Sequence, residues 1–466
     1  MSTSVKKGLR RRPDLDTLYT INADGSRNVL QPAEAHGRWH TRRTVVFAVL
    51  IAILVAVPWI RIGGAPALLL DIPARTAYIA GSTFTREDFY LVFFLLTGFG
   101  FALFAVTSVW GRVWCGYACP QTVFLEGVFR RVESWIEGSR NERLRRQHGP
   151  WTFDKVWRKA AKQFVFLLLA LFVAHTALAY FIPTNELLPA LLAGPEGHWT
   201  AFAWTIGLAA LLYFDFAWFR EQFCVIVCPY GRLQSALIDD DTLSVGYDAR
   251  RGEPRGPKAQ AAGDCIDCGS CVSVCPTGID IRNGLQMECV GCTNCIDACD
   301  SIMRQVGRAE GLVRYDSLRG FRGEGRRWLR PRLFVYAFLA LVGAGVFAFT
   351  ALQRTSFDVT VLRARGLPYT LTDETIENLF TIHVQNKSNA AASYRIEPES
   401  AVGAASRIEW KVGADTLELG ALAEAKVPVF AHVDRREYHG PAPTHLRVTD
   451  LQTGEARRVE LVFRGP

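Results

Sequence analysis

The chain has 466 residues and a formal net charge of +8, with 49% hydrophobic and 21% charged residues. A chain of this length exceeds one compact core, so we expect two or three structural units. Its apolar residues gather in long runs separated by basic stretches, which is typical of a multi-span membrane protein. Because Lys and Arg flank these runs, we interpret them as topology signals and expect no nucleic-acid partner.

Five apolar segments each approach the roughly 20 residues that a helix needs to cross a bilayer. They are Thr44–Ile60, Phe89–Trp110, Phe164–Ile182, Thr200–Phe219 and Leu333–Gln353. The alternative is five buried helices of one soluble protein. Near-uncharged runs flanked by Trp, Tyr and Arg argue against that alternative.

The distribution of Lys and Arg predicts the orientation of these spans. The loop Pro183–Trp199 contains neither residue, whereas the segment before span one and the loops after spans two and four are strongly basic. By the positive-inside rule the N-terminus is cytoplasmic and the segment after span five is periplasmic. We therefore expect a multi-pass protein of the bacterial inner membrane, in contact with its lipids.

Chain order then gives seven predicted divisions. They are a basic cytoplasmic segment 1–43, a transmembrane hairpin 44–110, an amphipathic and basic cytoplasmic loop 111–163, a second transmembrane hairpin 164–229, a cytoplasmic ferredoxin domain 230–332, a membrane helix 333–353 and a periplasmic β domain 354–466. Within the first loop, Gln121–Glu137 is amphipathic and is predicted to lie along the membrane surface.

The C-terminal division carries short alternating runs separated by turn signals, as in a small β-sandwich. The predicted strands are Phe357–Leu362, Leu379–Val384, Tyr394–Ile396, Ile408–Val412, Val427–Val433, His445–Val448 and Arg458–Phe463. Asn386-Lys387-Ser388 matches a glycosylation acceptor, but we interpret it as a turn.

All 12 cysteines fall between Cys115 and Cys299, and eight of them form one motif written twice. The motif is C-x-x-C-x-x-C-x-x-x-C, in which three thiolates hold one cubane and the fourth reaches the other. We therefore assign one [4Fe–4S] cluster to Cys265, Cys268, Cys271 and Cys299, and a second to Cys275, Cys289, Cys292 and Cys295. This is a bacterial-type 2[4Fe–4S] ferredoxin domain of α+β class.

Zinc is the alternative occupant of such cysteines. Zinc sites pair two C-x-x-C dipeptides or add histidine, and no His lies between His198 and His383. The second copy of the motif has Asp300 where the first has Pro276. That difference changes the local turn and not the ligands.

Two further cysteine pairs close the two predicted hairpins. Cys115 and Cys119 precede Pro120, and Cys224 and Cys228 precede Pro229. Cysteines four residues apart share a helix face, and the following proline kinks or ends the helix. Four converging thiolates favour Cu(I), an iron–sulfur cluster or a redox disulfide. Buried apolar cysteines are the alternative, but two matched pairs indicate a redox or metal role.

Four other residues near these motifs invite functional interpretations. His175 lies inside span three, where we expect a packed, hydrogen-bonded side chain rather than a ligand. For Asp215 in span four, an ion pair, a proton relay and a simple interfacial position stay open. We interpret Arg112 and Arg220 as interfacial arginines, with stabilisation of the nearby thiolates as the alternative.

The ordered set of five spans, two C-x-x-x-C-P motifs, an eight-cysteine insert and a β domain resembles the CcoG family, also called FixG or RdxA. The resemblance covers essentially the whole chain. It implies an accessory protein for assembly of cbb-type cytochrome c oxidase, with that oxidase or its copper-assembly factors as partners. It also implies an immunoglobulin-like C-terminal fold and a cupric reductase in which Cys115, Cys119, Cys224 and Cys228 handle copper.

Two other functions stay open at this point. Membrane subunits of nitrate and nitrous-oxide reductase systems share the C-x-x-x-C-P and ferredoxin elements, which implies an electron conduit between the quinone pool and an oxidoreductase. The third function is a non-enzymatic iron–sulfur scaffold or sensor. The sequence predicts no particular electron donor and no oligomeric state.

Overall fold

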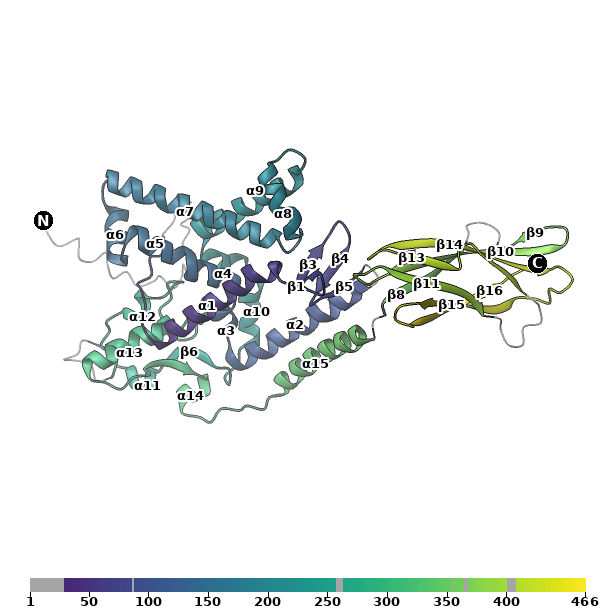
Figure 1. Cartoon of the computed structure of the whole chain (residues 1–466). Coiled ribbons are helices and arrows are strands. Elements are labelled where there is room, and N and C mark those ends of the chain that lie inside the picture. Colours follow the sequence, from purple (N-terminus) through teal and green to yellow (C-terminus); the bar gives the residue numbers. More distant parts are fainter. Residues whose placement is uncertain (1–28, 86–87, 257–262, 354, 364–367, 400–407) are drawn as a thin grey trace. The chain divides into compact units, whose positions relative to one another are not determined.

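The computed structural model describes residues 29–85, 88–256, 263–353, 355–363, 368–399 and 408–466. The chain divides into two compact units (Figure 1). Unit 1 comprises Met1–Pro58 and Phe93–Val346, and unit 2 comprises Trp59–Val92 and Phe347–Pro466. Residues 1–28 of the predicted basic segment lie outside the described residues.

Five helices in the described part of the chain are long and apolar enough to cross a membrane, which confirms the predicted number of spans. They are α1 (Arg38–Ala56) with the turn that follows it, α2 (Phe89–Trp110), α7 (Phe153–Leu178), α9 (Trp199–Phe214) with the π-helical turn Asp215–Phe219, and α15 (Pro331–Leu352). Helix α7 begins at Phe153 rather than at Phe164 because Thr152 caps it, accepting a hydrogen bond from the Lys155 amide. The first turns of α7 contain charged residues, so the hydropathy of the sequence does not show that they belong to the helix.

Shorter helices connect the spans of unit 1. They are α3 (Val113–Tyr117), α4 (Pro120–Phe124), α5 (Arg130–Glu137), α6 (Arg140–His148), α8 (Thr184–Ala193) and α10 (Pro229–Leu237). The amphipathic segment Gln121–Glu137 runs through α4, a π-helical turn and α5. Its polar residues Arg130, Glu133 and Glu137 are buried, so its charged side faces into the protein rather than outward.

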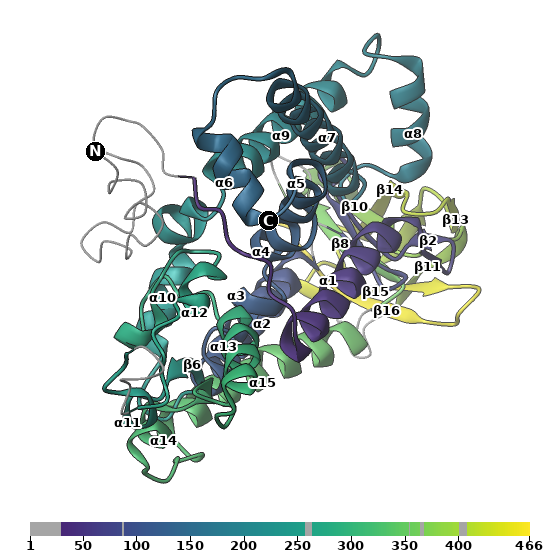
Figure 2. The ribbon, with the colours of Figure 1, turned by 90° about the vertical axis from the view of Figure 1, so that its left-hand side faces the viewer.

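The iron–sulfur segment of unit 1 combines small helices with one two-stranded ribbon (Figure 2). Strand β6 (Ser244–Tyr247) pairs antiparallel with β7 (Val313–Asp316). The helices are α11 (Ala249–Gly252), α12 (Ser270–Ser273), α13 (Asn294–Val306) and α14 (Leu318–Arg322). Ile281, Ile296 and Met303 form its core together with several motif cysteines, so this small segment packs around its cysteines.

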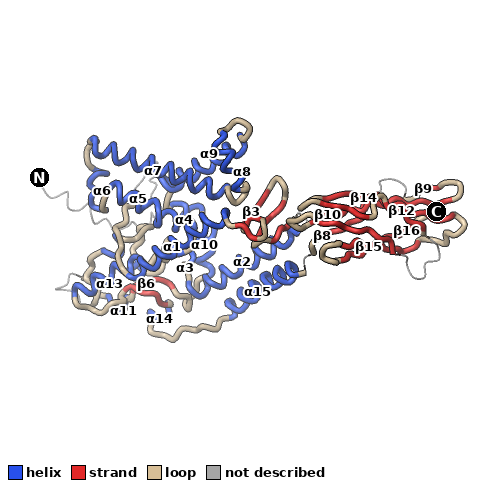
Figure 3. The backbone as a smooth tube through the Cα atoms, in the orientation of Figure 1, coloured by secondary structure: helices blue, strands red, loops and turns tan. Residues whose placement is uncertain are grey.

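Strands dominate unit 2, where two antiparallel sheets form a sandwich (Figure 3). One sheet has the order β12-β14-β10-β8, with β9 also paired to β10, and the other has the order β13-β11-β15-β16. The strands are β8 (Phe357–Arg363), β9 (Thr370–Leu371), β10 (Thr375–Asn386), β11 (Ala392–Glu399), β12 (Glu409–Val412), β13 (Thr416–Leu419), β14 (Glu424–Asp434), β15 (Ala442–Asp450) and β16 (Ala456–Phe463). All seven predicted strands are present, which confirms the expected β-sandwich. Strands β9 and β13 were not predicted, because they are short.

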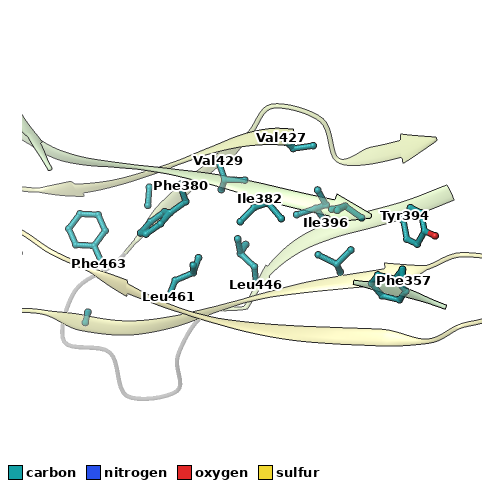
Figure 4. Close-up of a cluster of buried hydrophobic side chains, with 14 of the residues drawn as sticks. Phe357, Phe380, Ile382, Tyr394, Ile396, Val427, Val429, Leu446, Leu461 and Phe463 are labelled. Atoms are coloured by element: carbon teal, nitrogen blue, oxygen red, sulfur yellow. The ribbon is translucent and has the colours of Figure 1, made fainter. Parts of the chain in front are cut away.

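Alternate residues of the long strands fill the space between the two sheets (Figure 4). Phe357, Ile382, Tyr394 and Leu446 are fully buried there. Figure 4 shows side chains of both sheets pointing toward one another across this layer. Apolar residues alternate with polar ones along these strands because one face of each sheet is buried.

We expect Leu446→Ala to lower the stability of unit 2 by about 2–5 kcal/mol, since it removes a fully buried side chain and leaves a cavity. Leu451→Ala is the matched control, because Leu451 is 43% exposed. Calorimetric unfolding of the full chain measures both changes. Equal effects of the two substitutions would contradict the assignment of this core.

Unit 2 also contains a segment that the sequence did not reveal, between span one and span two. It forms the ribbon of β1 (Arg61–Ile62) with β2 (Ala65–Pro66) and the sheet of β3 (Leu68–Asp71), β4 (Thr76–Ile79) and β5 (Ser82–Phe84). Thr83 Oγ1 donates to Asn389 Oδ1 at 2.6 Å, and buried Lys387 pairs with Asp88 at 3.2 Å. The turn after β10 therefore anchors the sandwich to this segment.

Candidate functional site: two cysteine cavities beside paired C-x-x-x-C-P motifs

The eight motif cysteines surround two neighbouring cavities, each with about 340 Å³ of space not filled by atoms. The first, here called the proximal cavity, is lined by Cys275, Cys289, Cys292 and Cys295. The second, the distal cavity, is lined by Cys265, Cys268, Cys299 and Arg282. Cys271 lines both cavities, so they are separated by little more than one side chain.

The chemistry of these linings fits iron–sulfur clusters. Among the described residues lining the two cavities there are thiols but no His, Asp or Glu, which is the soft donor set that such clusters take. Burial raises the pKa of the Cys292 thiol to about 11, against an opposing effect of Arg43. A buried thiol of this kind becomes a thiolate ligand when bound iron displaces its proton.

The two C-x-x-x-C-P motifs have the same local geometry. Cys119 is the N-cap of α4 with Pro120 as the first helical residue, and Cys228 is the N-cap of α10 with Pro229 in the same place. Proline suits that position because its missing N–H would have no partner in the helix. Each motif therefore ends one helical segment and begins another, with the second cysteine at the junction.

The four cysteines of these two motifs, Cys115, Cys119, Cys224 and Cys228, are here called the membrane-side cysteines. The fold brings them close enough to affect one another electrostatically. Burial raises the pKa of Cys115 to about 12, and nearby Cys119 and Cys228 add to the rise. Burial likewise raises the pKa of Cys119, opposed by hydrogen bonds from the backbone N–H groups of Thr122 and Gln121. Without a bound cation Cys115 and Cys119 are thiols at neutral pH, and a metal that bound them would displace their protons.

No three His, Cys, Asp or Glu side chains in the described part of the chain are grouped closely enough to hold a single metal ion. Cys115 Sγ instead donates to Gln234 Oε1 at 3.5 Å. The Gln234 side chain is fully buried, and its Nε2 has no partner among the described residues. The four cysteines thus form a loose group with a buried amide beside it.

Helix α3, which contains Cys115, packs directly against the proximal cavity. A Cβ atom on Gly116 would lie 2.4 Å from the carbonyl oxygen of Gly291, which stands between Cys289 and Cys292. Tyr117 Oη lies 3.4 Å from Thr293 Oγ1 on the other side of the same loop. Glycine at position 116 is therefore required by the close approach of the two backbones.

Arg112 connects the same two regions. Its side chain is buried and donates to the carbonyl of Cys289 at 2.7 Å and to the carbonyl of Met287. The guanidinium also acts to lower the pKa of Cys115, against the larger effect of burial. The Arg112 side chain thus lies inside the protein rather than on its surface.

Arg220 is also buried. It forms a two-pronged contact with Glu133, at 3.1 and 3.0 Å, and its backbone has φ of 51°, in the left-handed region. Lys162 approaches Glu133 at 3.1 Å and Glu137 at 2.9 Å. This network fixes α5 against α7 and against the chain just before Cys224. In the sequence, the amphipathic pattern around Glu133 was the one signal that this segment has a partner.

The two intramembrane polar residues have partners within the fold. His175 Nδ1 lies 2.7 Å from the carbonyl of Leu171 one turn earlier, as expected for a hydrogen-bonded side chain. Asp215 begins a π-helical turn and accepts a hydrogen bond from Gln121 at 3.2 Å. Gln121 also donates to the Arg220 carbonyl at 3.1 Å, which ties the segment after Cys119 to the segment before Cys224.

Comparisons with known proteins cover nearly the entire chain. Protein RdxA of Cereibacter sphaeroides is 37% identical over 91% of this chain and 93% of its own length. Protein RdxB of the same organism is 36% identical over 84% of this chain and 86% of its own length. The nitrogen fixation protein FixG of Rhizobium meliloti is 35% identical, covering 80% of each chain. This chain belongs to the FixG/RdxA family.

Three domain families match parts of this FixG/RdxA member. The 4Fe-4S dicluster domain matches residues 219–318, and the IG-like fold at the C-terminal of FixG matches residues 347–466. A family described as a 4Fe-4S binding domain matches 91–141 and 198–239, the segments that carry the two C-x-x-x-C-P motifs. The chain is thus a membrane-associated iron–sulfur electron-transfer protein, and its predicted fold class and family are confirmed.

Proposed function

We propose that this protein reduces Cu(II) to Cu(I) with electrons supplied by its iron–sulfur segment. Each Cu(II) would accept one electron by way of the clusters that the motif cysteines would hold, and a soluble one-electron donor on the cytoplasmic side would replace that electron. The cysteines of the distal cavity (Cys265, Cys268, Cys271 and Cys299) hold one centre. Those of the proximal cavity (Cys275, Cys289, Cys292 and Cys295) hold the other. The assignment rests on the lining of the two cavities.

The observation that carries the proposal is the contact between Gly116 and Gly291. It sets the backbone beside Cys115 against the loop between Cys289 and Cys292. Thiolates favour Cu(I) over Cu(II), so a copper ion that draws the loosely grouped Cys115, Cys119, Cys224 and Cys228 together would be stabilised there as the product of the reduction. These residues therefore place thiol ligands for copper close to the cysteines that would hold the proximal cluster.

In the cell we place the N-terminus and the iron–sulfur segment in the cytoplasm and the β-sandwich in the periplasm of a bacterial inner membrane. The basic loops support this orientation. The copper delivered as Cu(I) serves assembly of a cbb-type cytochrome c oxidase, with that oxidase or its copper-assembly factors as the partner. The β-sandwich offers a docking surface for such a partner.

Anaerobic stopped-flow mixing of the reduced protein with Cu(II) tests the proposal. Cluster absorbance reports oxidation, and a Cu(I)-specific chelator reports the product. Matched oxidation and Cu(I) formation are expected in the parent chain and are expected to disappear in Cys115→Ser/Cys119→Ser. The double variant Cys224→Ser/Cys228→Ser is its counterpart in the second motif. Slow oxidation at equal rates in all three proteins would refute copper reduction at this site.

A second candidate is an electron conduit to another oxidoreductase, with a third [4Fe–4S] cluster on the four membrane-side cysteines. The 4Fe-4S binding family that matches 91–141 and 198–239 favours it. Iron analysis separates the candidates, since two cubanes bring about eight irons per chain and three bring about twelve. About twelve irons in the parent and about eight in Cys115→Ser/Cys119→Ser would support a third cluster, whereas about eight in both would exclude it and leave the copper-driven oxidation to separate the two functions.

A further inference from the structure

Three buried arginines contact the backbone around the proximal cavity: Arg43 lies in span helix α1, Arg112 just before α3 and Arg130 in α5. Each donates a hydrogen bond to a main-chain carbonyl within or next to a cysteine motif. The contacts are Arg43 to Cys292 at 2.7 Å, Arg112 to Cys289 at 2.7 Å and Arg130 to Pro276 at 3.1 Å. The distal cysteines have no such set of contacts from span-side helices among the described residues.

The charges of these three arginines are not compensated equally. Arg130 pairs with Glu126 and, at 3.1 Å, with Glu221, and Arg43 lies 3.7 Å from Glu126. Arg112 makes no ion pair with a carboxylate of the described residues, and its buried Nε has no partner there. Arg112 therefore presents to the proximal loop a guanidinium that no carboxylate of the described residues pairs with.

At the distal cavity, in contrast, carboxylates compensate the positive charge of the lining arginine. Its lining arginine, Arg282, pairs with Asp280 at 2.7 Å and with Asp267 at 2.5 Å. Two carboxylates thus surround one guanidinium at this site. The other three distal cysteines are buried, but Cys268 is exposed, and none of the four proximal cysteines is. Cys268 therefore gives a soluble donor a point of approach to the distal site.

Reduction adds a negative charge to a cluster, and a nearby buried cation stabilises that charge more strongly than one in water. We propose that Arg112 is a positioning residue that sets a higher reduction potential at the proximal site than at the distal site. Electrons then run from the exposed Cys268 side toward the proximal cysteines and onward to Cys115. This inference rests on the proposed binding of two clusters, but not on copper as the acceptor.

Potentiometric titration of the full-length protein, followed by electron paramagnetic resonance, tests the inference. Two distinct midpoint potentials are expected in the parent chain. Arg112→Gln removes the charge and keeps a hydrogen-bond donor, so it is expected to lower the higher potential and leave the lower one in place. Arg112→Lys keeps the charge and is expected to retain most of the difference.

Arg158→Gln is the matched control, because Arg158 donates to the Ile136 carbonyl and pairs with Asp154. It is expected to move neither potential. The inference fails if Arg112→Gln moves neither potential, moves both equally or lowers only the lower one. It also fails if Arg112→Lys, with clusters intact, changes the potentials as much as Arg112→Gln. Two separated potentials without copper-driven oxidation would refute the proposed copper reduction and leave this inference standing.

Discussion

Replacing Gly116 with alanine is expected to slow electron transfer to the membrane-side cysteines while both cluster-binding cavities remain intact. The added Cβ would lie 2.4 Å from the Gly291 carbonyl oxygen and 3.2 Å from that of Val290. Backbone atoms cannot rotate away from such a contact, so the proximal loop must retreat from α3. Overpacking of this kind costs about 1–3 kcal/mol of stability.

Stopped-flow oxidation of the reduced protein by Cu(II) measures the expected loss in rate, and thermal unfolding measures the loss in stability. Gly207→Ala is the matched control, since a Cβ at Gly207 meets nothing within 4 Å and α9 gains a better helix former. Ferricyanide serves as an oxidant that needs no cysteine site, and its reaction is expected to be unchanged. If Gly116→Ala oxidises with Cu(II) at the parent rate, electrons do not pass through this contact.

The second large effect is expected from Glu133→Gln, which removes the carboxylate that Arg220 and Lys162 share. Glu133 and Arg220 are 2% and 3% exposed, so the substitution leaves buried cations without their partner. Breaking a buried ion pair in this way costs about 3–5 kcal/mol. Because Arg220 stands four residues before Cys224, we also expect the second C-x-x-x-C-P motif to lose its fixed position.

The same carboxylate makes stability depend on pH. Burial acts to raise the pKa of Glu133, but Arg220 and Lys162 outweigh burial and hold the pKa at about 2, below its ordinary 4.5. Since the folded pKa is the lower one, its contribution of about 3 kcal/mol is complete above about pH 4.5 and is lost as the pH falls toward 2. Glu133→Gln is expected to flatten the stability profile across this window.

Thermal unfolding in detergent between pH 2 and pH 7 measures both effects. Asp154→Asn is the control, because Asp154 is 58% exposed in its pair with Arg158. An exposed pair contributes at most about 1 kcal/mol. A profile for Glu133→Gln that parallels the parent would show that the buried network does not govern the acid response.

The features that depend on local pattern could be predicted from the amino-acid sequence. Runs of about 20 apolar residues require helices in lipid, because a helix satisfies its own backbone hydrogen bonds. A period of two, as along β10 and β14, requires a sheet with one buried face. The spacing of the eight cysteines reflects the shape of a cubane. Five spans, a β-sandwich and the iron–sulfur segment followed from these patterns without a structure.

Contacts between residues far apart in the chain could not be predicted in this way and are known from the three-dimensional fold. No residue near Gly116 in the sequence indicates that Gly116 contacts Gly291. Likewise, no local pattern distinguishes Arg112, which donates to the Cys289 carbonyl, from an arginine at a membrane surface. The pairing of Arg220 with Glu133 is equally hidden. Such contacts join segments far apart in the chain, and they depend on how helices pack rather than on the residues beside each partner. The site was therefore predictable as a set of thiols, and its connection to the membrane-side cysteines was not.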